Sequence, residues 1–260
     1  MPIVYFVLLF FSTFSYLTET DEELLVSLGN NWNFLPSADE VSAEEIKFHN
    51  LSHAKELFNL SAGSWISRGS GQESLISLRS PVLTGSGACG SFLILEDGLP
   101  IRPAGFCNVN NLFETSLNLA SKVETLKGPS SARFGGNALH GAINIQTLDI
   151  DDKNYLRTEV DKEGSFKSSF KYQESKNWIL GISLDSDKGF RDFSGFDQQK
   201  LVFKTNNDVN NWKASTFLSL TNLNQETAGY IDTYTSSSRE SNLNPEAYRD
   251  AKSFRLNTIF

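Results

Sequence analysis

From residue 151 to Phe260, apolar and polar residues alternate in six segments that are joined mostly by short polar turns. In the segment 155–160, leucine, threonine and valine alternate with tyrosine, arginine and glutamate. A period of two residues predicts β-strands with one apolar and one polar face. The six strands expected from the pattern lie at 155–160, 166–172, 178–184, 200–204, 212–220 and 254–260.

Two architectures suit such strands. A soluble antiparallel sheet can keep one face in water and bury the other. A transmembrane β-barrel shows the same alternation, with aromatic residues near the strand ends and long loops at one rim. The interval Asn222–Asp250, rich in serine, threonine, asparagine and tyrosine, would be such a long loop. The alternation alone slightly favours the soluble sheet.

Helical signals occur only in the earlier part of the chain, residues 37–150. Ser42–Glu45 has the Ser-x-x-Glu form of a capping box, which predicts a helix that begins there. Ser52 can cap a second short helix, and Ser61–Gly63 would end it. These helices distinguish residues 37–150 from the strands that follow.

Strand signals occur in the same region. The apolar runs 92–96 and 99–101 flank Asp97-Gly98, a pair that favours a type I′ hairpin turn. The segment 75–80 also alternates. Together with the two helices, these signals predict a small α+β domain for residues 37–150.

The stretch from Leu126 to Thr147 is rich in turn-forming residues and closes on an alternating strand. Gly128-Pro129 marks a turn, and Gly135-Gly136 marks a second bend where at least one residue needs a positive φ. No Gly-Lys-Ser/Thr follows these glycines, so the stretch is not a phosphate-binding loop. We expect a folded-back structural unit without chemistry of its own.

The chain begins with an unbroken apolar run, Ile3–Phe11, that is too short to span a bilayer comfortably. The run is typical of a secretory signal, and we expect residues 1–17 to be a signal peptide. No lysine or arginine occurs before Lys47, which is unusual for a signal, and a buried strand or core helix is the alternative. A signal peptide favours the cell envelope and therefore the barrel.

Residues 18–36 resemble an extended tether that contains one short β-prone stretch, Asp21–Ser27. Such a stretch is either an ordinary first strand or a free segment that pairs with the edge of a partner's sheet. The residues themselves favour neither interpretation.

Composition limits the classes of function. The 260 residues carry a net charge of −8 without a strongly basic patch, so nucleic acid is not an expected partner. His49, His53 and His140 are scattered, and no Gly-x-Ser-x-Gly elbow occurs. We expect no catalytic residues, no metal site and no cofactor.

Cys89 and Cys107 are the only cysteines and lie on either side of Asp97-Gly98. A hairpin that reverses there would bring them close, and a cysteine pair in a secreted chain predicts a disulfide. Closing a loop of this size contributes roughly 3 kcal/mol in the chain-entropy model.

The segment from Ser121 to Thr147 resembles the closing motif of the plug domain in TonB-dependent outer-membrane receptors. The hairpin and the early helices follow in that family's order, and Asp21–Ser27 resembles a TonB box near the mature N-terminus. The resemblance is close over about residues 20–150 and loose over 151–260. The matching elements of the closing motif are Val123-Glu124, Gly128-Pro129, Ser130–Gly135 and Gly141–Thr147.

The resemblance implies an α+β plug domain over 37–150, followed over 151–260 by antiparallel strands of an incomplete transmembrane β-barrel. Ser80 replaces the family's glycine after Arg79, so the backbone geometry there is in question. A barrel of about twenty-two strands is expected for such transporters. Six strands would then indicate a truncated gene or a fragment.

The resemblance also implies site residues. Arg79 and Glu124 resemble charges by which the plug latches onto the barrel, although they could instead pair with each other or face solvent. Inward-facing Arg157, Glu159, Lys167 and Lys171 would line the transport path. The segment expected to bind the energy-coupling protein TonB comprises Asp21, Glu22, Glu23, Leu24, Leu25, Val26 and Ser27.

The leading hypothesis is a non-enzymatic receptor in the outer membrane of a Gram-negative bacterium. It would take up a scarce small-molecule ligand, a metal chelate such as a siderophore or an oligosaccharide, by TonB-driven opening of the plug. Its partners would be TonB, the ligand and outer-membrane lipid. The main alternative is a secreted or periplasmic β-rich binding module, and a secreted hydrolase is more remote because no catalytic residue stands out.

Overall fold

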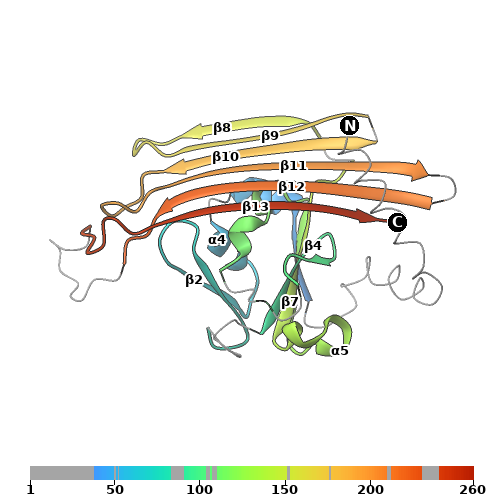
Figure 1. The fold of residues 1–260 in the computed structure, drawn as a ribbon, viewed down its shortest axis with the longest axis horizontal. Coiled ribbons are helices and arrows are strands. Elements are labelled where there is room, and N and C mark those ends of the chain that lie inside the picture. The colour runs from blue at the N-terminus through green and yellow to red at the C-terminus, as the bar shows by residue number, and fades with distance from the viewer. Residues whose placement is uncertain are drawn as a thin grey trace, which may run out of the picture. The chain divides into compact units, whose positions relative to one another are not determined.

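The computed structural model describes residues 38–49, 51, 53–82, 91–103, 106, 110–150, 153–175, 177–209, 212–229 and 240–260 (Figure 1). The predicted signal peptide, the segment 18–36 with Asp21–Ser27, and both cysteines lie outside these residues. Residues 38–150 form a mixed α/β unit, which we call the globule, and strands β8–β13 form one sheet, which we call the wall. This arrangement confirms the predicted fold class.

The globule opens with β1 (Ala38–Ser42) and two short helices, α3 (Ala43–His49) and α4 (Ala54–Phe58). The predicted capping box is present: Glu45 Oε2 accepts the N–H of Ser42 at 2.9 Å, and Glu45 N–H donates to Ser42 Oγ at 3.4 Å. The cap of α4 is His53 rather than the predicted Ser52, because His53 Nδ1 accepts the N–H of Lys55 at 3.0 Å.

None of the helices among the described residues is long and apolar enough to cross a membrane.

A five-stranded sheet in the order β1-β6-β7-β4-β5 forms the centre of the globule. β4 and β7 are parallel, and the other neighbours in this sheet are antiparallel. A separate hairpin, β2 (Ser64–Arg68) and β3 (Ser74–Leu78), extends from it. The remaining elements are β4 (Phe92–Glu96), β5 (Leu99–Pro100), η3 (Leu112–Glu114), η4 (Leu117–Leu119), β6 (Lys122–Lys127), α5 (Ser131–Phe134), η5 (Gly136–Ala138) and β7 (Gly141–Gln146).

The core of the globule lies between this sheet and the helices. Leu57, Ile94 and Ile143 are completely buried in it. The apolar side chains that the strand and helix patterns predicted to face inward therefore meet in one cluster.

The Asp97-Gly98 hairpin forms as predicted between β4 and β5. Asp97 has φ 50° and Gly98 has φ 80°, and two successive positive φ angles are what a type I′ turn requires. The N–H of Gly98 donates to Asn144 Oδ1 at 2.9 Å, which ties the turn to β7. Arg79, which precedes the unusual Ser80, also has a positive φ, 49°.

Gly141 begins β7 and closes the glycine-rich stretch. Its φ of +146° is one that side-chain-bearing residues rarely adopt. A Cβ at this position would lie 2.2 Å from the carbonyl oxygen of Leu126 on β6. The glycine is therefore required by the close approach of two backbones.

The wall consists of six consecutive antiparallel strands, and Figure 1 shows it as a curved sheet that extends over the globule. β12 ends at Glu226 and β13 begins at Tyr248, so the connection expected at Asn222–Asp250 spans 227–247. The strands are β8 (Tyr155–Val160), β9 (Phe166–Ser175), β10 (Trp178–Asp187), β11 (Phe196–Val209), β12 (Trp212–Glu226) and β13 (Tyr248–Ile259).

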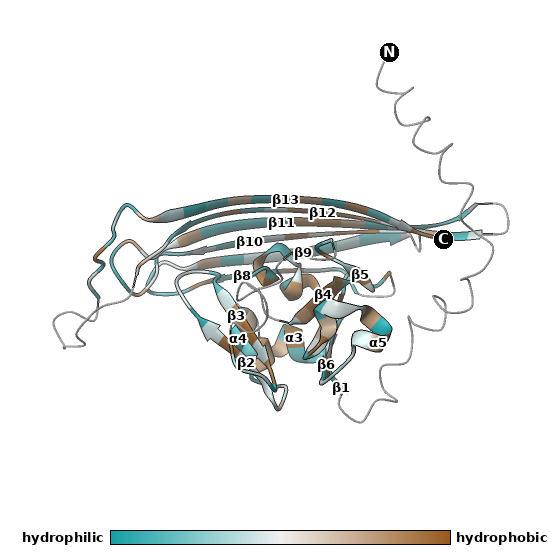
Figure 2. Cartoon of the chain, turned by 60° about the horizontal axis from the view of Figure 1, so that its bottom comes forward, coloured by the Kyte–Doolittle hydropathy of each residue, from teal (hydrophilic) through white to brown (hydrophobic). Residues whose placement is uncertain are grey.

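The predicted alternation is visible along these strands (Figure 2). On β8, Leu156 and Val160 are 70% and 71% exposed on the outer face, whereas Arg157 and Glu159 face the globule side. On β13, Phe254 faces outward and Arg255 inward.

The inner face of the wall is less polar than the alternation predicts. Ile179, Val202 and Phe217 point inward and are buried against Leu119, Leu148 and Ile150 of the globule. These six side chains form a second apolar cluster, distinct from the core of the globule. The wall and the globule are consequently joined by hydrophobic packing as well as by polar contacts.

Candidate functional site: the contact between globule and wall

A buried ionic network centred on Arg255 of β13 joins the wall to the globule. The guanidinium donates to Glu96 Oε2 from Nε at 3.1 Å and from Nη2 at 2.5 Å. It also donates from Nη2 to the carbonyl oxygen of Glu114 at 2.7 Å and pairs with the Glu114 carboxylate at 3.5 Å. Glu96 is 1% exposed and Glu114 is 4% exposed, so these charges have left water.

The network is balanced in charge and almost fully hydrogen-bonded. Glu96 ends β4 directly before the Asp-Gly turn, and its Oε1 accepts the N–H of Ser116 at 3.1 Å. Arg102 pairs with Glu114, so two guanidinium groups face two carboxylates. Burial raises the pKa of Glu96, and the charge of Arg255 opposes this effect. Separating Arg255 from Glu96 would be costly, because the buried Glu96 carboxylate would lose its cationic partner.

The segment 113–116 receives further bonds from the wall. Lys200 of β11 donates to the carbonyl of Thr115 at 2.6 Å, and Gln198 donates to that of Phe113 at 3.2 Å. Thr221 of β12 donates to the Glu114 carbonyl at 3.1 Å. Three neighbouring strands, β11, β12 and β13, thus hold one short segment of the globule.

A second ion pair fixes the Asp-Gly hairpin. Asp97 Oδ2 lies 3.3 Å from Nζ of Lys204 on β11. The same carboxylate accepts the N–H of Thr147 at 2.9 Å and its hydroxyl at 2.5 Å. Asp97 therefore links the hairpin, the end of β7 and the wall.

The turn between β2 and β3 contacts the wall strands at the ends that carry the long β12–β13 connection. Gln225 Oε1 accepts the N–H of Gln72 at 3.0 Å, and Ser70 Oγ donates to the carbonyl of Ala228 at 2.8 Å. Glu73 pairs with Arg249 at 3.0 Å. We call residues 69–73 the apex turn, because they are the part of the globule that reaches the long connections of the wall.

A hollow of about 930 Å³ lies between the apex turn and these connections. Its lining carries charges of both signs together with Phe190 and Phe196, so it suits a solute with both polar and apolar parts. The hairpin turns β8–β9, β10–β11 and β12–β13 contribute Asp161, Glu163, Asp187, Lys188, Phe190, Arg191 and Glu240, and the globule contributes Arg68, Gly69, Ser70, Gly71 and Glu73.

Arg191 holds the base of the long β12–β13 connection. Its guanidinium donates to the carbonyls of Ala228 at 3.1 Å and Gly229 at 2.5 Å from Nη1. It also donates to the carbonyl of Ser241 from Nε at 3.1 Å and from Nη2 at 2.7 Å. One side chain thereby joins both ends of this connection to the β10–β11 turn.

His53 connects the apex turn to α4. Its ring is buried, its Nδ1 caps the helix, and its Nε2 lies 2.9 Å from the carbonyl oxygen of Glu73. Because a carbonyl only accepts, the proton of the neutral ring is on Nε2. Burial, with a smaller contribution from the charge of Arg68, lowers the pKa of His53 from 6.5 to about 4.

This shift predicts that folding becomes weaker in acid. In the folded protein His53 stays neutral down to about pH 4, whereas in the unfolded chain it takes up a proton below pH 6.5. The free energy of unfolding is therefore unaffected by His53 above pH 6.5 and decreases as the pH falls from 6.5 towards 4. The difference corresponds to about 3 kcal/mol. Urea unfolding at pH 7 and pH 4.5 should show the loss, and His53→Gln should lose less stability between these two values. A wild-type pH dependence retained in His53→Gln would contradict the assignment.

The structure places the two predicted latch residues within the globule. Glu124 on β6 is 3% exposed and pairs with Lys122 at 2.8 Å, and it accepts from Asn144 at 2.8 Å and Gln146 at 3.2 Å. Arg79 is exposed after β3, and its N–H donates to the carbonyl of Gly63 at 2.9 Å. Their role as a latch remains a prediction, as do the segment Asp21–Ser27 and the disulfide between Cys89 and Cys107.

Glu96 and Arg255, whose charges bridge the globule and the wall, were not among the predicted site residues. Glu96 stands at the end of a strand that is otherwise apolar, and Arg255 stands between two outward apolar residues. The sequence predicts that a charge at either position is enclosed, but it does not indicate which residue pairs with that charge. Among the described residues, no group of three or more His, Cys, Asp or Glu side chains is arranged to hold a metal ion.

Comparison with known proteins gives two findings. A family model, the TonB-dependent receptor plug domain, matches residues 34–142. The fold is similar to that of the ferric yersiniabactin uptake receptor FyuA from Yersinia pestis, with a TM-score of 0.63 and 20% identity over 85% of this chain and 37% of that one.

Two further structures agree. The pyoverdine outer membrane receptor FpvA from Pseudomonas aeruginosa has a TM-score of 0.59 and 13% identity over 75% of this chain. The ferric citrate transporter FecA has a TM-score of 0.58 and 15% identity over 79% of this chain. The chain spans only 37%, 29% and 34% of the length of these three proteins.

Proposed function

We propose that this chain, whose residues 34–142 match the family model of the TonB-dependent receptor plug domain, acts in an outer-membrane receptor that takes up a scarce ligand by energy-coupled opening. The globule is the plug, and the wall is part of the surrounding barrel. The observation that carries this proposal is the orientation of the wall: its charged inner face binds the globule, and its outer face is apolar.

The outer face shows a band suited to lipid. One row of residues paired across all six strands is entirely apolar, and the neighbouring row towards Phe260 is apolar on β9–β13. A membrane barrel needs such a band, whereas a soluble sheet would bury it. The two rows are Leu156, Phe170, Ile182, Leu201, Leu220 and Phe254, and Tyr172, Leu180, Phe203, Leu218 and Leu256.

Membrane extraction tests the proposal. The protein expressed from its own gene in a Gram-negative host should sediment with the outer membrane and dissolve only in detergent. The alternative, a periplasmic or secreted binding module, predicts recovery in the soluble fraction without detergent. A soluble protein would refute the receptor.

The hollow beside the apex turn is the proposed ligand site. Receptors of similar fold are named for ferric yersiniabactin, pyoverdine and ferric citrate, which favours a metal chelate over an oligosaccharide. Mixed charges at the rim suit such a polar ligand. Coupling to TonB would use Asp21–Ser27, which precedes β1 in the chain.

Arg191 should keep the rim of this site ordered. In Arg191→Ala, four hydrogen bonds to backbone carbonyls are lost, and amide exchange at residues 227–229 and 240–242 should accelerate at least tenfold. Arg191→Lys should be intermediate, because an ammonium cannot reach three carbonyls with the same geometry. Hydrogen exchange followed by mass spectrometry measures both, and unchanged exchange in Arg191→Ala would show that the loop base is held by other contacts.

A further inference from the structure

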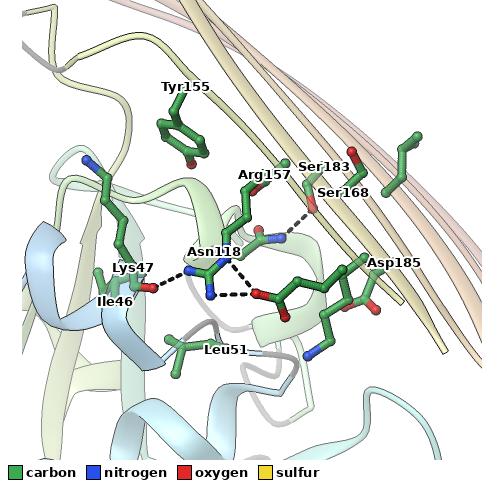
Figure 3. A pocket seen from close by; sticks show the side chains of 13 residues that line it. Ile46, Lys47, Leu51, Asn118, Tyr155, Arg157, Ser168, Ser183 and Asp185 are labelled. Carbon is green, nitrogen blue, oxygen red and sulfur yellow. Dashed lines mark hydrogen bonds and ion pairs between the residues drawn. The ribbon is translucent and has the colours of Figure 1, made fainter. Parts of the chain in front are cut away.

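We propose, resting on the function above, that the transport route runs along one flank of the globule, between it and strands β8–β11, and that this route selects anionic solutes. The flank, which we call the seam, is bordered by α3, Leu51 and Asn118 on the globule side (Figure 3).

The seam is the polar flank of the contact. Two small cavities of about 30 and 20 Å³ lie in it, and they share Leu51, Asn118 and Asp185 in their linings. The second reaches Gln72 of the apex turn, and the first reaches Tyr155 at the start of β8. Together they extend from the proposed ligand site towards the other end of the wall.

The seam has the properties of a hydrated space. Asn118 Oδ1 and Asp185 Oδ1 are buried and accept no hydrogen bond from the described residues. Buried acceptors of this kind normally bind water. At the β8 end, the ammonium groups of Lys47 and Lys171 lie 5.4 and 5.7 Å from the ring centre of Tyr155, which narrows the space there.

The other flank is sealed. Between the globule and β10–β12 lies the second apolar cluster, which includes Ile179, Val202 and Phe217. On β13, Arg255 is held by Glu96 and Glu114. Separating the globule from the wall on this flank would expose apolar surface and split buried charge pairs, which costs free energy. When the globule moves, the seam therefore opens before this flank does.

Two hydrogen bonds cross the first cavity of the seam, and the bonds of Gln198 and Lys200 to the segment 113–116 border the second. Arg157 Nη1 donates to the carbonyl of Lys47 at 2.5 Å, and Asn118 Nδ2 donates to Ser183 Oγ; both are drawn in Figure 3. Arg157 is partly exposed, so its bond can be exchanged for one to water at low cost. Ser183 is buried, so its bond to Asn118 breaks only if water enters the adjoining cavity.

The charged side chains that line the seam indicate which class of solute it favours. The two cavities are lined by four cationic side chains and two anionic ones, a net charge of +2. Such a passage attracts anions and repels cations. The cations are Lys47, Arg157, Lys167 and Lys200, and the anions are Glu159 and Asp185.

Permeability of the outer membrane to nitrocefin, an anionic chromogenic cephalosporin hydrolysed by a periplasmic β-lactamase, tests the seam without the natural ligand. The double variant Asn118→Ala/Arg157→Gln, which removes both bonds at the first cavity, should raise the nitrocefin hydrolysis rate at least threefold. The matched control Thr221→Val/Lys204→Gln removes one hydrogen bond and one charged contact on the other flank and should behave as wild type. Adding Lys167→Glu to the leaky variant should lower the nitrocefin rate at least twofold.

The outcomes separate the two proposals. Rates are compared at equal amounts of protein in the outer membrane. If the two double variants give equal nitrocefin rates, or if Asn118→Ala/Arg157→Gln gives the wild-type rate, the seam is not the transport route. The proposed receptor function is unaffected by either result. Leakage that Lys167→Glu does not reduce overturns the anion preference. A protein absent from the outer membrane overturns the receptor and with it the seam.

Discussion

Replacing Arg255 by methionine should lower the free energy of unfolding by about 3–5 kcal/mol, which is the usual cost of leaving a buried charge without its partner. The substitution keeps the volume of the side chain but strands the carboxylate of Glu96, which is 1% exposed. Glu114 retains Arg102, so the loss is concentrated on one carboxylate. Urea unfolding of the detergent-solubilised protein, followed by tryptophan fluorescence, measures the change.

A second variant distinguishes two causes of the destabilisation, the lost attraction between Arg255 and Glu96 and the burial of the Glu96 charge without a partner. Glu96→Gln combined with Arg255→Met removes both charges and should be less destabilised than Arg255→Met alone. Arg255→Lys should fall between wild type and Arg255→Met, because it keeps the charge without the fork that reaches both Glu96 and the Glu114 carbonyl. If the free energy of unfolding of Arg255→Met is within about 1 kcal/mol of that of the wild type, the network is not what joins β13 to the globule.

Gly141→Ala should be about as damaging, at about 3–5 kcal/mol. The new Cβ would lie 2.2 Å from a backbone oxygen of β6 and would require a φ of +146°. Neither strain is relieved by a rotamer change, because the oxygen belongs to Leu126, whose strand pairs with β7. The thermal midpoint of the β-sheet signal in circular dichroism should fall accordingly.

Two other glycines provide the controls. Gly136 has no unusual φ and nothing within 4 Å of an added Cβ, so Gly136→Ala should be neutral or slightly stabilising. Gly98 has φ +80° with open space around it, so Gly98→Ala should cost about 1 kcal/mol from backbone strain alone. If Gly141→Ala costs no more than Gly98→Ala, the close approach to β6 is relaxed by a small shift of the strands.

Local features could be predicted from the residues. The capping box at Ser42–Glu45 and the turn at Asp97-Gly98 each depend on a few neighbouring positions, and both formed as expected. The faces of the wall strands followed from a period of two residues, which placed Arg157 and Arg255 on the inner side. The cap of α4 was displaced by one residue to His53, since a histidine ring can also accept from the first turn of a helix.

The candidate site could be predicted only in part. Charges on the inner face of the strands were expected to meet the globule, and in the structure Arg255 meets Glu96 and Glu114. The predicted latch role of Arg79 and Glu124 stays a prediction. Glu124 is enclosed by Lys122, Asn144 and Gln146, which are its neighbours in the central sheet.

The sequence by itself determined that residues 151–260 form strands, which side of each of these strands is polar, and where glycines must turn the chain, because these depend on steric and hydrogen-bonding rules among near neighbours. Only the tertiary structure decided which charges meet. Arg255 and Glu96 are 159 residues apart, and a period of two residues specifies a face without specifying what will lie against it. The apolar side chains of Ile179, Val202 and Phe217 were likewise exceptions on a polar face until the globule supplied Leu119, Leu148 and Ile150 to cover them.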